Sequence, residues 1–506
     1  MTEQTLVREQ LFIGGQFVDA RDGGPVDVVE AASEEVIGSA VLGGRADVDA
    51  AVRAARTAAS GTWPTLTPAE RQPLLHRFAD YLSAQADSTA RLVSRQNGMP
   101  LALSTGANGH FPALLVRYYA DLAAAQAPDI RRGMRHTSTL VLRHPLGVVG
   151  AITPWNYPQA LAAMKLAPAL AAGCTVVLKP PPETALDCYA FAEAARHAGL
   201  PDGVVNIVPG GRDAGSFLVS HPGIDKIAFT GSTAAGRQIA SDCARLLRPV
   251  TLELGGKSAA ILAEDVDLGL YLRALLRVSL PNAGQTCHSS TRILAPRSRY
   301  REIVDAVTST VAALRVGDPL DPATDIGPLV SSGQRERVLA YIDEPGDSGA
   351  RLTTGGRTAE IPDRGWFVAP TVFADVDNTA RVAQEEIFGP VLTITPYETD
   401  DDAVALANDS AYGLAGTVWT EDPGRGINIA RRVVTGTIGV NHYGLDPGAP
   451  FGGVKASGLG HELGPEGLRA YQRTQSIYLA ASIPASAAHP ANDAGRASVA
   501  RKESVS

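Results

Sequence analysis

The alternation of short apolar runs with helix-like segments between Val148 and Leu254 constrains the fold more than any other feature of the sequence. The runs VVGAI, TVVLK, VVNIV, DKIAFT and VTLEL have strand character, and the expected helices between them are Pro158 to Ala172, Leu186 to Ala198, Ala214 to Ser220 and Ala234 to Arg245. Two neighbouring parallel strands need such a crossover connection, because the chain must return to the end of the sheet where the first strand began. The pattern therefore predicts a doubly wound parallel sheet with helices on its faces.

A second series of the same kind follows Gly255 and Gly256. It begins with the apolar run SAAILA, and its further expected elements are helices near Leu268 to Ser279 and Tyr300 to Leu314 and strands near Val391 to Pro396 and Gly416 to Thr420. We therefore expect two α/β domains. Residues 44–126 carry apolar side chains at helical spacing, which predicts a helical region. The alternating run TSTLVLR, from Thr137 to Arg143, predicts a strand that is compatible with a hairpin.

Charge and hydropathy exclude several classes of protein. The chain has 506 residues with 45 Lys and Arg against 53 Asp and Glu, a formal net charge of −8 that provides no basic field for nucleic acid or an anionic membrane. No window approaches the roughly 18 consecutive apolar residues of a membrane helix, and the N-terminal residues lack a signal-peptide pattern. We therefore expect a cytoplasmic protein. Residues 482–506 have no aromatic side chain and are rich in Ser, Ala and charge, which predicts a disordered tail.

Four cysteines occur, Cys174, Cys188, Cys243 and Cys287, and their spacing forms no CxxC pair or Cys/His cluster of the kind that zinc requires. The sequence thus predicts reduced thiols and no metal site. The first three lie in apolar or helix-like surroundings and are expected in the core. Cys287 lies in the polar stretch NAGQTCHSST, which favours exposure to a site, while an inert core cysteine stays open as the alternative.

Lysine is rare in this chain, because only 6 of the 45 basic residues are lysine. A lysine retained against an arginine-rich background indicates a position that needs a compact ammonium on a flexible stem. This argument selects Lys179, Lys257 and Lys455 for specific roles. Lys226 and Lys502 are expected to lie on the solvated surface.

Three features lie at the ends of predicted strands, where open α/β sheets bind ligands. The run GSTAAG, from Gly231 to Gly236, opens a helix, so its backbone N–H groups can hold a phosphate or serve only as a turn and cap. Glu253 ends a strand, where partial burial would raise its pKa toward that of a general base; a surface carboxylate is the alternative. Asn156, in ITPWNYP, can donate to a developing oxyanion or only form a turn.

Seven motifs occur in order between Thr153 and Gly464: TPWNYP, VLKP, FTGSTAAG, LELGGKS, GQTC, EEIFGPV and APFGGVKASGLGHELG. Together they strongly resemble the NAD(P)-dependent aldehyde dehydrogenase superfamily, over roughly Leu11 to Ala480. The resemblance implies oxidation of an aldehyde to a carboxylic acid with hydride transfer to the cofactor. It also implies the fold, which is two doubly wound α/β domains plus a small β oligomerisation arm.

The resemblance assigns the catalytic roles. Cys287 would add to the aldehyde, and the thiohemiacetal would expel hydride to leave a thioester. The Asn156 amide, with the Cys287 backbone N–H, would hold the oxyanion. Glu253 would activate the water that hydrolyses the thioester, and a glutamate at this position implies a non-acylating enzyme. Lys165 and Glu462 resemble a pair that relays protons away from this base.

The resemblance also implies a set of residues around the nicotinamide, the pyrophosphate and the adenosine of the cofactor: Ile152, Thr153, Trp155, Lys179, Gly215, Gly231, Ser232, Glu386 and Phe388. Many relatives carry a glutamate three residues after the lysine, where it bonds the ribose 2′-hydroxyl and repels a 2′-phosphate. Here Pro182 occupies that position, and Glu183 lies one residue further along the chain. NAD is therefore the expected cofactor, and NADP stays open, with Arg212 as the one candidate partner for a phosphate.

The substrate tunnel is expected to be mostly apolar and aromatic, lined by Tyr157, Met164, Thr286, His288, Tyr443, Leu445 and Phe451. This lining favours medium aliphatic or aromatic aldehydes. The implied division is a cofactor-binding domain of residues 1–125 and 146–254, a catalytic domain of residues 255–456, and an oligomerisation element of residues 126–145 and 457–481. That element would pair edge strands between subunits, so we expect a homodimer or homotetramer.

Two other classes of function remain as alternatives. In a cofactor-independent cysteine hydrolase, Cys287 and His288 would form the reactive centre, but adjacent side chains usually diverge, and this hypothesis leaves Lys179 and the EEIFGP segment without a role. A catalytically silent binding protein on the same fold would not need Cys287, Glu253 and Asn156 together.

Overall fold

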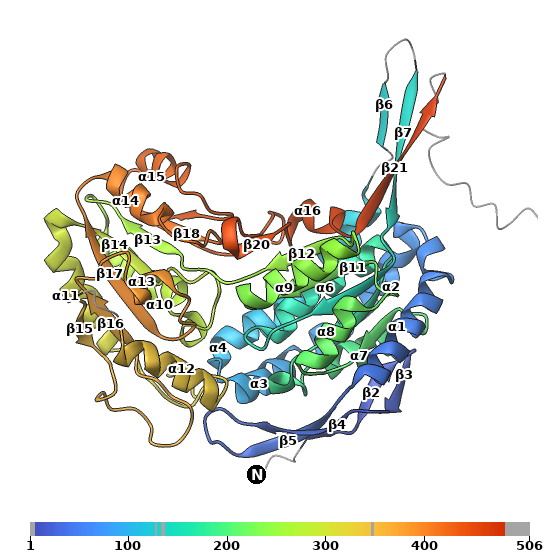
Figure 1. Ribbon diagram of the computed structural model, residues 1–506, viewed down its shortest axis with the longest axis horizontal. Coiled ribbons are helices and arrows are strands. Elements are labelled where there is room, and N and C mark those ends of the chain that lie inside the picture. Colours follow the sequence, from blue (N-terminus) through green and yellow to red (C-terminus); the bar gives the residue numbers. More distant parts are fainter. Residues whose placement is uncertain (1–5, 127–128, 133–136, 346–348, 481–506) are drawn as a thin grey trace, which may run out of the picture.

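The computed structural model describes residues 6–126, 129–132, 137–345 and 349–480. The predicted disordered tail, residues 482–506, lies outside them. Two α/β lobes stand side by side, and a narrow β arm projects from one of them (Figure 1). The fold class predicted from the sequence is confirmed.

The first lobe is built on an eight-stranded sheet in the order β20-β12-β11-β8-β9-β10-β2-β3. Its parallel strands are β8 (Val148–Ile152), β9 (Thr175–Lys179), β10 (Val205–Ile207), β11 (Lys226–Thr230) and β12 (Val250–Glu253). The edges are antiparallel and are formed by β20 (Gly458–Leu459), β2 (Gln10–Ile13) and β3 (Gln16–Asp19). All five strands predicted between Val148 and Leu254 are present, because a parallel sheet covered on both faces needs continuous apolar runs.

Helices cover both faces of this sheet. One face packs against α2 (Pro68–Ala84), α5 (Phe111–Ala124), α6 (Pro158–Ala172) and α7 (Tyr189–Ala198), and the other against α1 (Arg45–Ala59), α8 (Arg212–Ser220) and α9 (Thr233–Arg245). Side chains of β8 alternate between them, since Val149 and Ala151 belong to the first core and Val148 and Ile152 to the second. The helical region also contains α3 (Ala86–Asn97), α4 (Leu101–Ser104) and the π-helix Thr105–His110.

The second lobe contains a seven-stranded sheet in the order β15-β16-β17-β14-β13-β18-β19. Its strands are β13 (Ala259–Leu262), β14 (Arg292–Pro296), β16 (Thr371–Ala374), β17 (Val391–Tyr397), β18 (Gly416–Trp419) and β19 (Gly439–Val440), all parallel, with β15 (Arg351–Thr354) antiparallel at one edge. The helices are α10 (Leu268–Ser279), α11 (Tyr300–Ala312), α12 (Ser332–Asp343), α13 (Arg381–Gln384), α14 (Asp400–Asn408) and α15 (Pro423–Ala430). This confirms the predicted second α/β domain.

The arm is a three-stranded antiparallel sheet in the order β21-β7-β6. It consists of β6 (Asp129–Arg132), β7 (Ser138–Pro145) and β21 (Gln472–Leu479), and α16 (Gly464–Arg469) precedes β21. The strand predicted at Thr137 to Arg143 thus pairs with β21, which lies within residues 457–481 of the predicted oligomerisation element. A further sheet of β1 (Leu6–Arg8), β5 (Val36–Leu42) and β4 (Gly24–Val29) lies at the N-terminal side, where the sequence analysis assigned no strands.

Burial corrects one expectation and confirms another. Lys226, expected on the solvated surface, begins β11 and is only 2% exposed, because its strand is central in the sheet. Its Nζ donates to Thr251 Oγ1 at 2.7 Å and lies 5.1 Å from the ring centroid of Tyr471. Cys174, Cys188 and Cys243 are buried, as expected of core cysteines.

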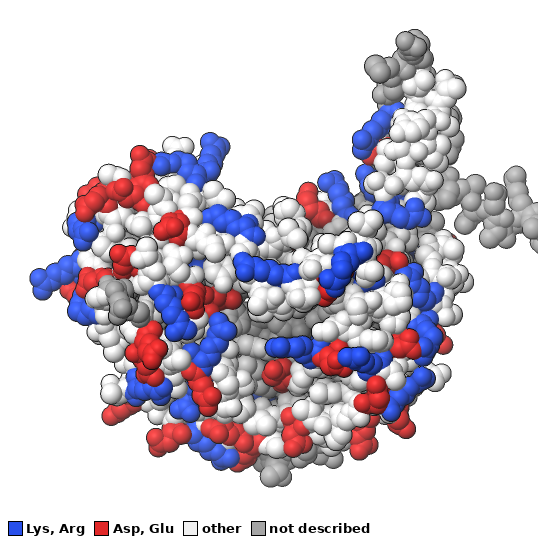
Figure 2. Space-filling model, in the orientation of Figure 1, with Lys and Arg blue, Asp and Glu red and all other residues white. Residues whose placement is uncertain are grey.

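The outer surface carries both signs of charge. Figure 2 shows Lys and Arg interspersed with Asp and Glu over the visible face of the two lobes, without a broad patch of either sign. None of the described helices combines the length and apolar character needed to cross a membrane.

Candidate active site

The predicted site residues gather at the carboxyl ends of β8, β11 and β12, the edge where open α/β sheets bind ligands. A cavity of about 570 Å³ opens there. Seven of the nine predicted cofactor residues line it: Ile152, Thr153, Trp155, Lys179, Gly215, Gly231 and Ser232. Its size is in the range of ligand pockets.

One wall of the cavity combines a lysine with a helix N-terminus. Lys179 is 6% exposed, and its Nζ donates to Pro180 O at 3.0 Å and Gly210 O at 2.6 Å. Burial lowers the pKa of Lys179 to about 8. Ser232 caps α9 by accepting from Ala235 N–H, so the remaining N–H groups of the first turn and the positive end of the helix dipole face the cavity. A Cβ at Gly215 would lie 3.4 Å from Lys179 Cδ, an ordinary van der Waals distance, so Gly215 lies against the stem of this lysine.

Glu386 and Phe388 approach the same cavity from the second lobe. The ring of Phe388 packs edge-on against Trp155 at a centroid distance of 5.4 Å. Glu386 Oε1 accepts from Gly256 N–H at 3.0 Å, and burial raises the pKa of Glu386 to about 7. Phe388 has a positive φ of 62°, a strained conformation that fixes the ring against Trp155.

Cys287 lies on a strained loop between the lobes. Just before it, the turn Pro281–Gly284 contains Asn282 and Ala283 with φ of 51° and 54°. Gly284 allows the loop to approach the EEIFGP segment, since a Cβ there would lie 2.1 Å from Gly389 O. Cys287 is partly exposed, unlike the three other cysteines. Strain of this kind is common where a side chain must be aimed at a site.

Asn156 and the Cys287 loop are joined directly. Asn156 Nδ2 donates to Gln285 O at 2.9 Å, which leaves its second N–H available, and Asn156 is 3% exposed. The backbone carbonyl oxygen of Asn156 accepts from Asn97 Nδ2 and Asn282 Nδ2, each at 3.1 Å, and its side-chain Oδ1 is buried without a partner in the described structure. The side-chain amide is therefore held on the loop that carries Cys287, where an oxyanion donor can act.

Glu253 is a buried carboxylate without a partner. It ends β12, is 2% exposed, and both of its carboxylate oxygens are buried without a hydrogen bond in the described structure. Burial, and next the charge of Glu462, raise its pKa well above the usual value, while Lys165 opposes them. The following loop touches Cys287, since a Cβ on Gly256 would lie 2.3 Å from Cys287 O. An unpaired carboxylate with a raised pKa is suited to accept a proton from water or a thiol.

Lys165 and Glu462 form a fully buried ion pair behind this carboxylate. Lys165 Nζ donates to Glu462 Oε1 at 2.7 Å and to Thr230 Oγ1 at 2.6 Å. Glu462 Oε2 is buried without a partner, so the pair has a free acceptor.

The expected tunnel residues form two groups around Cys287. The first is an aromatic cluster, in which the His288 ring lies 5.0 Å from the Tyr443 centroid and 6.5 Å from that of Phe451. In the second, Tyr157 OH bonds Thr286 Oγ1 at 2.8 Å. Met164 is buried in the hydrophobic core that also contains Phe451, whereas Leu445 is 38% exposed. Burial lowers the pKa of His288 to about 4, so the imidazole is neutral at physiological pH.

Two contributing residues were missed by the sequence analysis. Thr230 accepts from Lys165, and Asn97 holds the Asn156 carbonyl across 59 positions of sequence. Of these two residues, only Thr230 could have been found from the sequence, because it directly precedes the GSTAAG turn. Within the described ranges, no group of three or more His, Cys, Asp or Glu side chains is placed to hold a metal ion.

Fold and site together define a class of α/β enzyme in which a cysteine and a buried carboxylate adjoin a nucleotide-sized cleft. The family model of the aldehyde dehydrogenase family matches residues 17–477, and the chain belongs to that family. It is 54% identical over 478 residues to the geranial dehydrogenase of Castellaniella defragrans, which covers 94% of this chain and 99% of that protein.

Solved structures agree with this assignment. The aldehyde dehydrogenase of Mycobacterium tuberculosis in complex with NAD+ superposes with a TM-score of 0.92 at 47% identity, over 95% of this chain and 100% of that one. A mutant of aldehyde dehydrogenase C of Pseudomonas syringae, in complex with NAD+ and octanal, superposes with a TM-score of 0.89 at 37% identity, over 93% and 96% of the two chains.

Proposed function

We propose that this protein oxidises an uncharged, hydrophobic aldehyde to the carboxylic acid with NAD as hydride acceptor, Cys287 as nucleophile and Glu253 as general base. The observation that carries the proposal is the Glu253 carboxylate, buried with both oxygens unpaired at the end of β12, just before the loop that touches Cys287. Such a group is costly to a fold and is kept where chemistry needs it.

The residues around the cavity fit a dinucleotide. Lys179 and the α9 N-terminus provide donors for ribose and phosphate oxygens, and Trp155, Phe388 and Glu386 surround the end nearest Cys287. When bound, the oxidised nicotinamide supplies the hydride acceptor and a positive charge near the thiol.

The chain's own residues account for the remaining steps. Burial and the carboxylates of Glu386 and Glu253 raise the pKa of the Cys287 thiol, so it needs a base to lose its proton, and Glu253 is available. The thiolate adds to the aldehyde carbon while Asn156 donates to the oxyanion. After hydride has left the carbon, Glu253 removes a proton from water, the hydroxide adds to the thioester, and the acid departs as Cys287 is regenerated. Lys165 and Glu462 relay the proton away from Glu253.

The substrate class follows from the lining of the tunnel. The side chains proposed to line it are aromatic or apolar, and His288 is neutral. The 54% identical geranial dehydrogenase is named for a hydrophobic aldehyde, and the mutant of aldehyde dehydrogenase C is in complex with another, octanal.

The test is reduction of NAD by the purified protein with octanal, geranial and benzaldehyde, with betaine aldehyde as a cationic comparison. We expect turnover with the first three and little with the last. Cys287→Ser abolishes turnover without loss of NADH binding. Turnover that survives in Cys287→Ser would overturn the proposal.

The two alternatives are not favoured. A cysteine hydrolase needs a basic partner for the thiol, but the pKa of His288 is near 4 and its ring packs against Tyr443 and Phe451. A silent binding protein gains nothing from an unpaired buried carboxylate beside Cys287.

We also propose a homodimer or homotetramer in the cytoplasm, with the domain division stated from the sequence. The support for assembly is the arm, whose β21 pairs on one side with β7 and has no strand on its other side among the described residues.

A further inference from the structure

A second cavity, of about 410 Å³, lies in the first lobe and shares no lining residue with the cofactor cavity. It is bounded by β1, by the end of α2, by α3, and by the start of α7 with the residues just before that helix. Its size is in the range of ligand pockets. No step of the proposed reaction uses it.

Part of this cavity is apolar. Three leucines and two tyrosines line it: Leu6, Leu92, Leu186, Tyr81 and Tyr189. Leu186 and Tyr189 are only 1% and 3% exposed. Tyr189 OH donates to Gln10 O at 2.7 Å, so a residue outside the cavity lining satisfies the polar end of this side chain. A hydrocarbon group placed against these side chains would be removed from water, which favours its binding.

Two arginines of the lining lack an anionic partner. Arg8 Nε is buried without a hydrogen bond, and the Arg8 guanidinium lies 5.3 Å from the centroid of the Tyr189 ring. Arg91, on α3, is exposed, and within the described chain neither arginine forms an ion pair. A third arginine, Arg95, is held by Glu30 Oε1 at 2.7 Å. Because a buried donor without an acceptor is costly, Arg8 gains from an oxygen that a ligand would bring.

Two carboxylates line the same cavity, and each has partners of its own. Asp187 is 2% exposed and accepts from Gln159 Nε2 at 2.6 Å and from Gln96 Nε2 at 3.0 Å. Burial raises the pKa of Asp187 to about 7, so this group is partly neutral at physiological pH. Glu193 Oε2 lies 3.6 Å from Arg196 Nη1. These carboxylates disfavour a ligand with two negative charges, such as a phosphate monoester, more than a ligand with one.

We propose that Arg8 and Arg91 bind the carboxylate of a small aliphatic or aromatic acid, whose hydrocarbon group occupies the apolar part of the cavity. A carboxylate has one negative charge and two oxygens in a plane, the arrangement that the fork of a guanidinium matches. The proposed reaction forms acids of this class, but the site does not depend on that reaction.

The test is titration calorimetry of the full-length protein with octanoate, without cofactor or aldehyde. Octanoate supplies both the charge and the hydrocarbon, whereas acetate has the charge alone and 1-octanol the hydrocarbon alone. We expect octanoate to bind at least about tenfold more tightly than either. Arg8→Gln and Arg91→Gln should each raise the octanoate dissociation constant about tenfold, the size of one charge-assisted hydrogen bond.

The aldehyde tunnel is the competing location for octanoate. Binding in the tunnel survives in the double variant Arg8→Gln/Arg91→Gln, so the parent should show one further site per chain. Octanal oxidation, measured in parallel, should be the same in the parent and in these variants, which separates failure of this site from failure of the proposed function.

Arg431→Gln is the matched control, because Arg431 is exposed like Arg91 and has no ion pair among the described residues, but lies in the second lobe. It should not change the octanoate constant. The inference would be overturned by octanoate binding that is equal in the parent and the double variant, or absent from both. An equal loss in Arg431→Gln, or acetate that binds as tightly as octanoate, would overturn it as well.

Discussion

Glu253 stands in an environment that disfavours its own charge, since burial and Glu462 both raise its pKa. Glu253→Gln keeps the shape and removes the base. We expect hydride transfer to persist for one turnover while thioester hydrolysis slows about 10²- to 10⁴-fold, the usual contribution of a general base. Rapid-mixing measurements would then record one NADH per subunit followed by a slow phase. The absence of that burst together with full steady turnover would exclude the assigned role.

The same carboxylate predicts the pH dependence of turnover. Only ionised Glu253 can accept a proton, and its pKa is raised, so the hydrolysis rate should rise with pH through a range above the ordinary glutamate pKa and fall on acidification. In Glu253→Gln this acidic limb should disappear from the residual rate. A parent profile flat from pH 5 to 8 would contradict the prediction.

We expect His288 to favour flat substrates. Its neutral ring, next to Tyr443 and Phe451, offers a face to a conjugated aldehyde held at Cys287. Stacking of this kind contributes about 0.5–1.5 kcal/mol, or roughly 2- to 12-fold. In His288→Leu, the ratio of kcat/KM for benzaldehyde over cyclohexanecarbaldehyde should fall by that factor. His288→Phe is the control that retains the ratio, and a Leu variant with an unchanged ratio would exclude the role.

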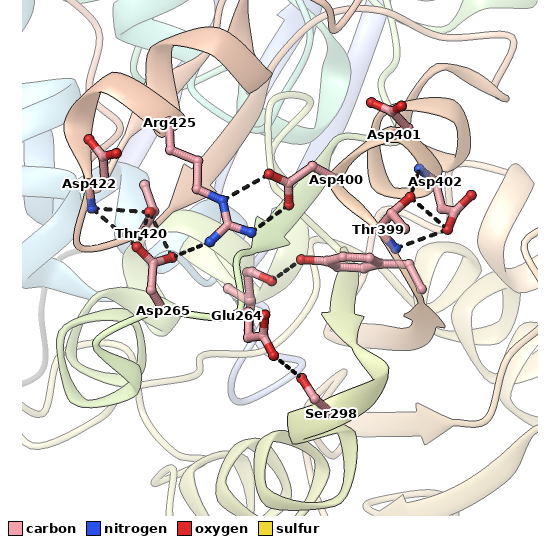
Figure 3. Close-up of polar contacts among 12 residues, drawn as sticks. Glu264, Asp265, Ser298, Thr399, Asp400, Asp401, Asp402, Thr420, Asp422 and Arg425 are labelled. Atoms are coloured by element: carbon pink, nitrogen blue, oxygen red, sulfur yellow. Dashed lines mark hydrogen bonds and ion pairs between the residues drawn. The ribbon is translucent and has the colours of Figure 1, made fainter.

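Ion pairs join the segments at the carboxyl edge of the second sheet. Figure 3 shows Arg425 of α15 between Asp400, which begins α14, and Asp265, which follows β13. Arg425 donates to both Asp400 oxygens at 2.8 and 2.7 Å and to Asp265 Oδ1 at 3.0 Å. One side chain thus joins the segments that follow β13, β17 and β18.

This junction predicts a measurable loss of stability. Arg425→Gln should lower the free energy of unfolding by about 1–2 kcal/mol, since the pair is bidentate and only about one-third exposed. Arg432→Gln breaks the more exposed pair with Asp401 and should cost no more than about 0.5 kcal/mol. Urea unfolding of both variants gives the comparison, and equal losses would contradict it.

Lys226 on β11 carries a buried ammonium, and burial lowers its pKa to about 8. The folded state therefore binds this proton less tightly than the unfolded chain, so the parent gains stability as pH rises from about 8 to the ordinary lysine value near 10.4. Lys226→Met has no such proton. Its stability relative to the parent should be greatest at pH 7 and decline above pH 8 in urea titrations, and a difference independent of pH would refute the assignment.

The parallel strands were predictable because they are buried on both faces, which forces apolar runs such as VVGAI. The strands β1 to β5 were not, since exposed and half-exposed positions interrupt their apolar pattern. Lys226 was wrongly expected on the surface, because the sequence around it does not show that Thr251 and Tyr471 contact its ammonium in the core. Likewise Thr230 and Asn97 act through contacts 65 and 59 positions away, which a local motif does not encode.

The arm carries the proposed contact between subunits. Strand β21 is exposed along most of its length, with Tyr478 82% and Ile477 37% exposed, and Figure 2 shows the visible described face of the arm as mostly uncharged. A strand with one charged residue, Arg473, and one open edge is prone to pair with another chain. A second copy of this protein would satisfy that edge and cover Tyr478.

Tyr478→Asp tests this assembly. An acid on an exposed side chain costs an isolated subunit almost nothing, because solvent-facing substitutions usually change stability by less than about 0.5 kcal/mol. In an interface it would be a buried, unpaired charge, which costs several kcal/mol. Light scattering should therefore give the parent as a dimer or tetramer and Tyr478→Asp as a smaller species with an unchanged circular dichroism spectrum. Val36→Asp, the same kind of change at the exposed first residue of β5, should leave the mass unaltered, and a monomeric parent would refute the proposed role of the arm.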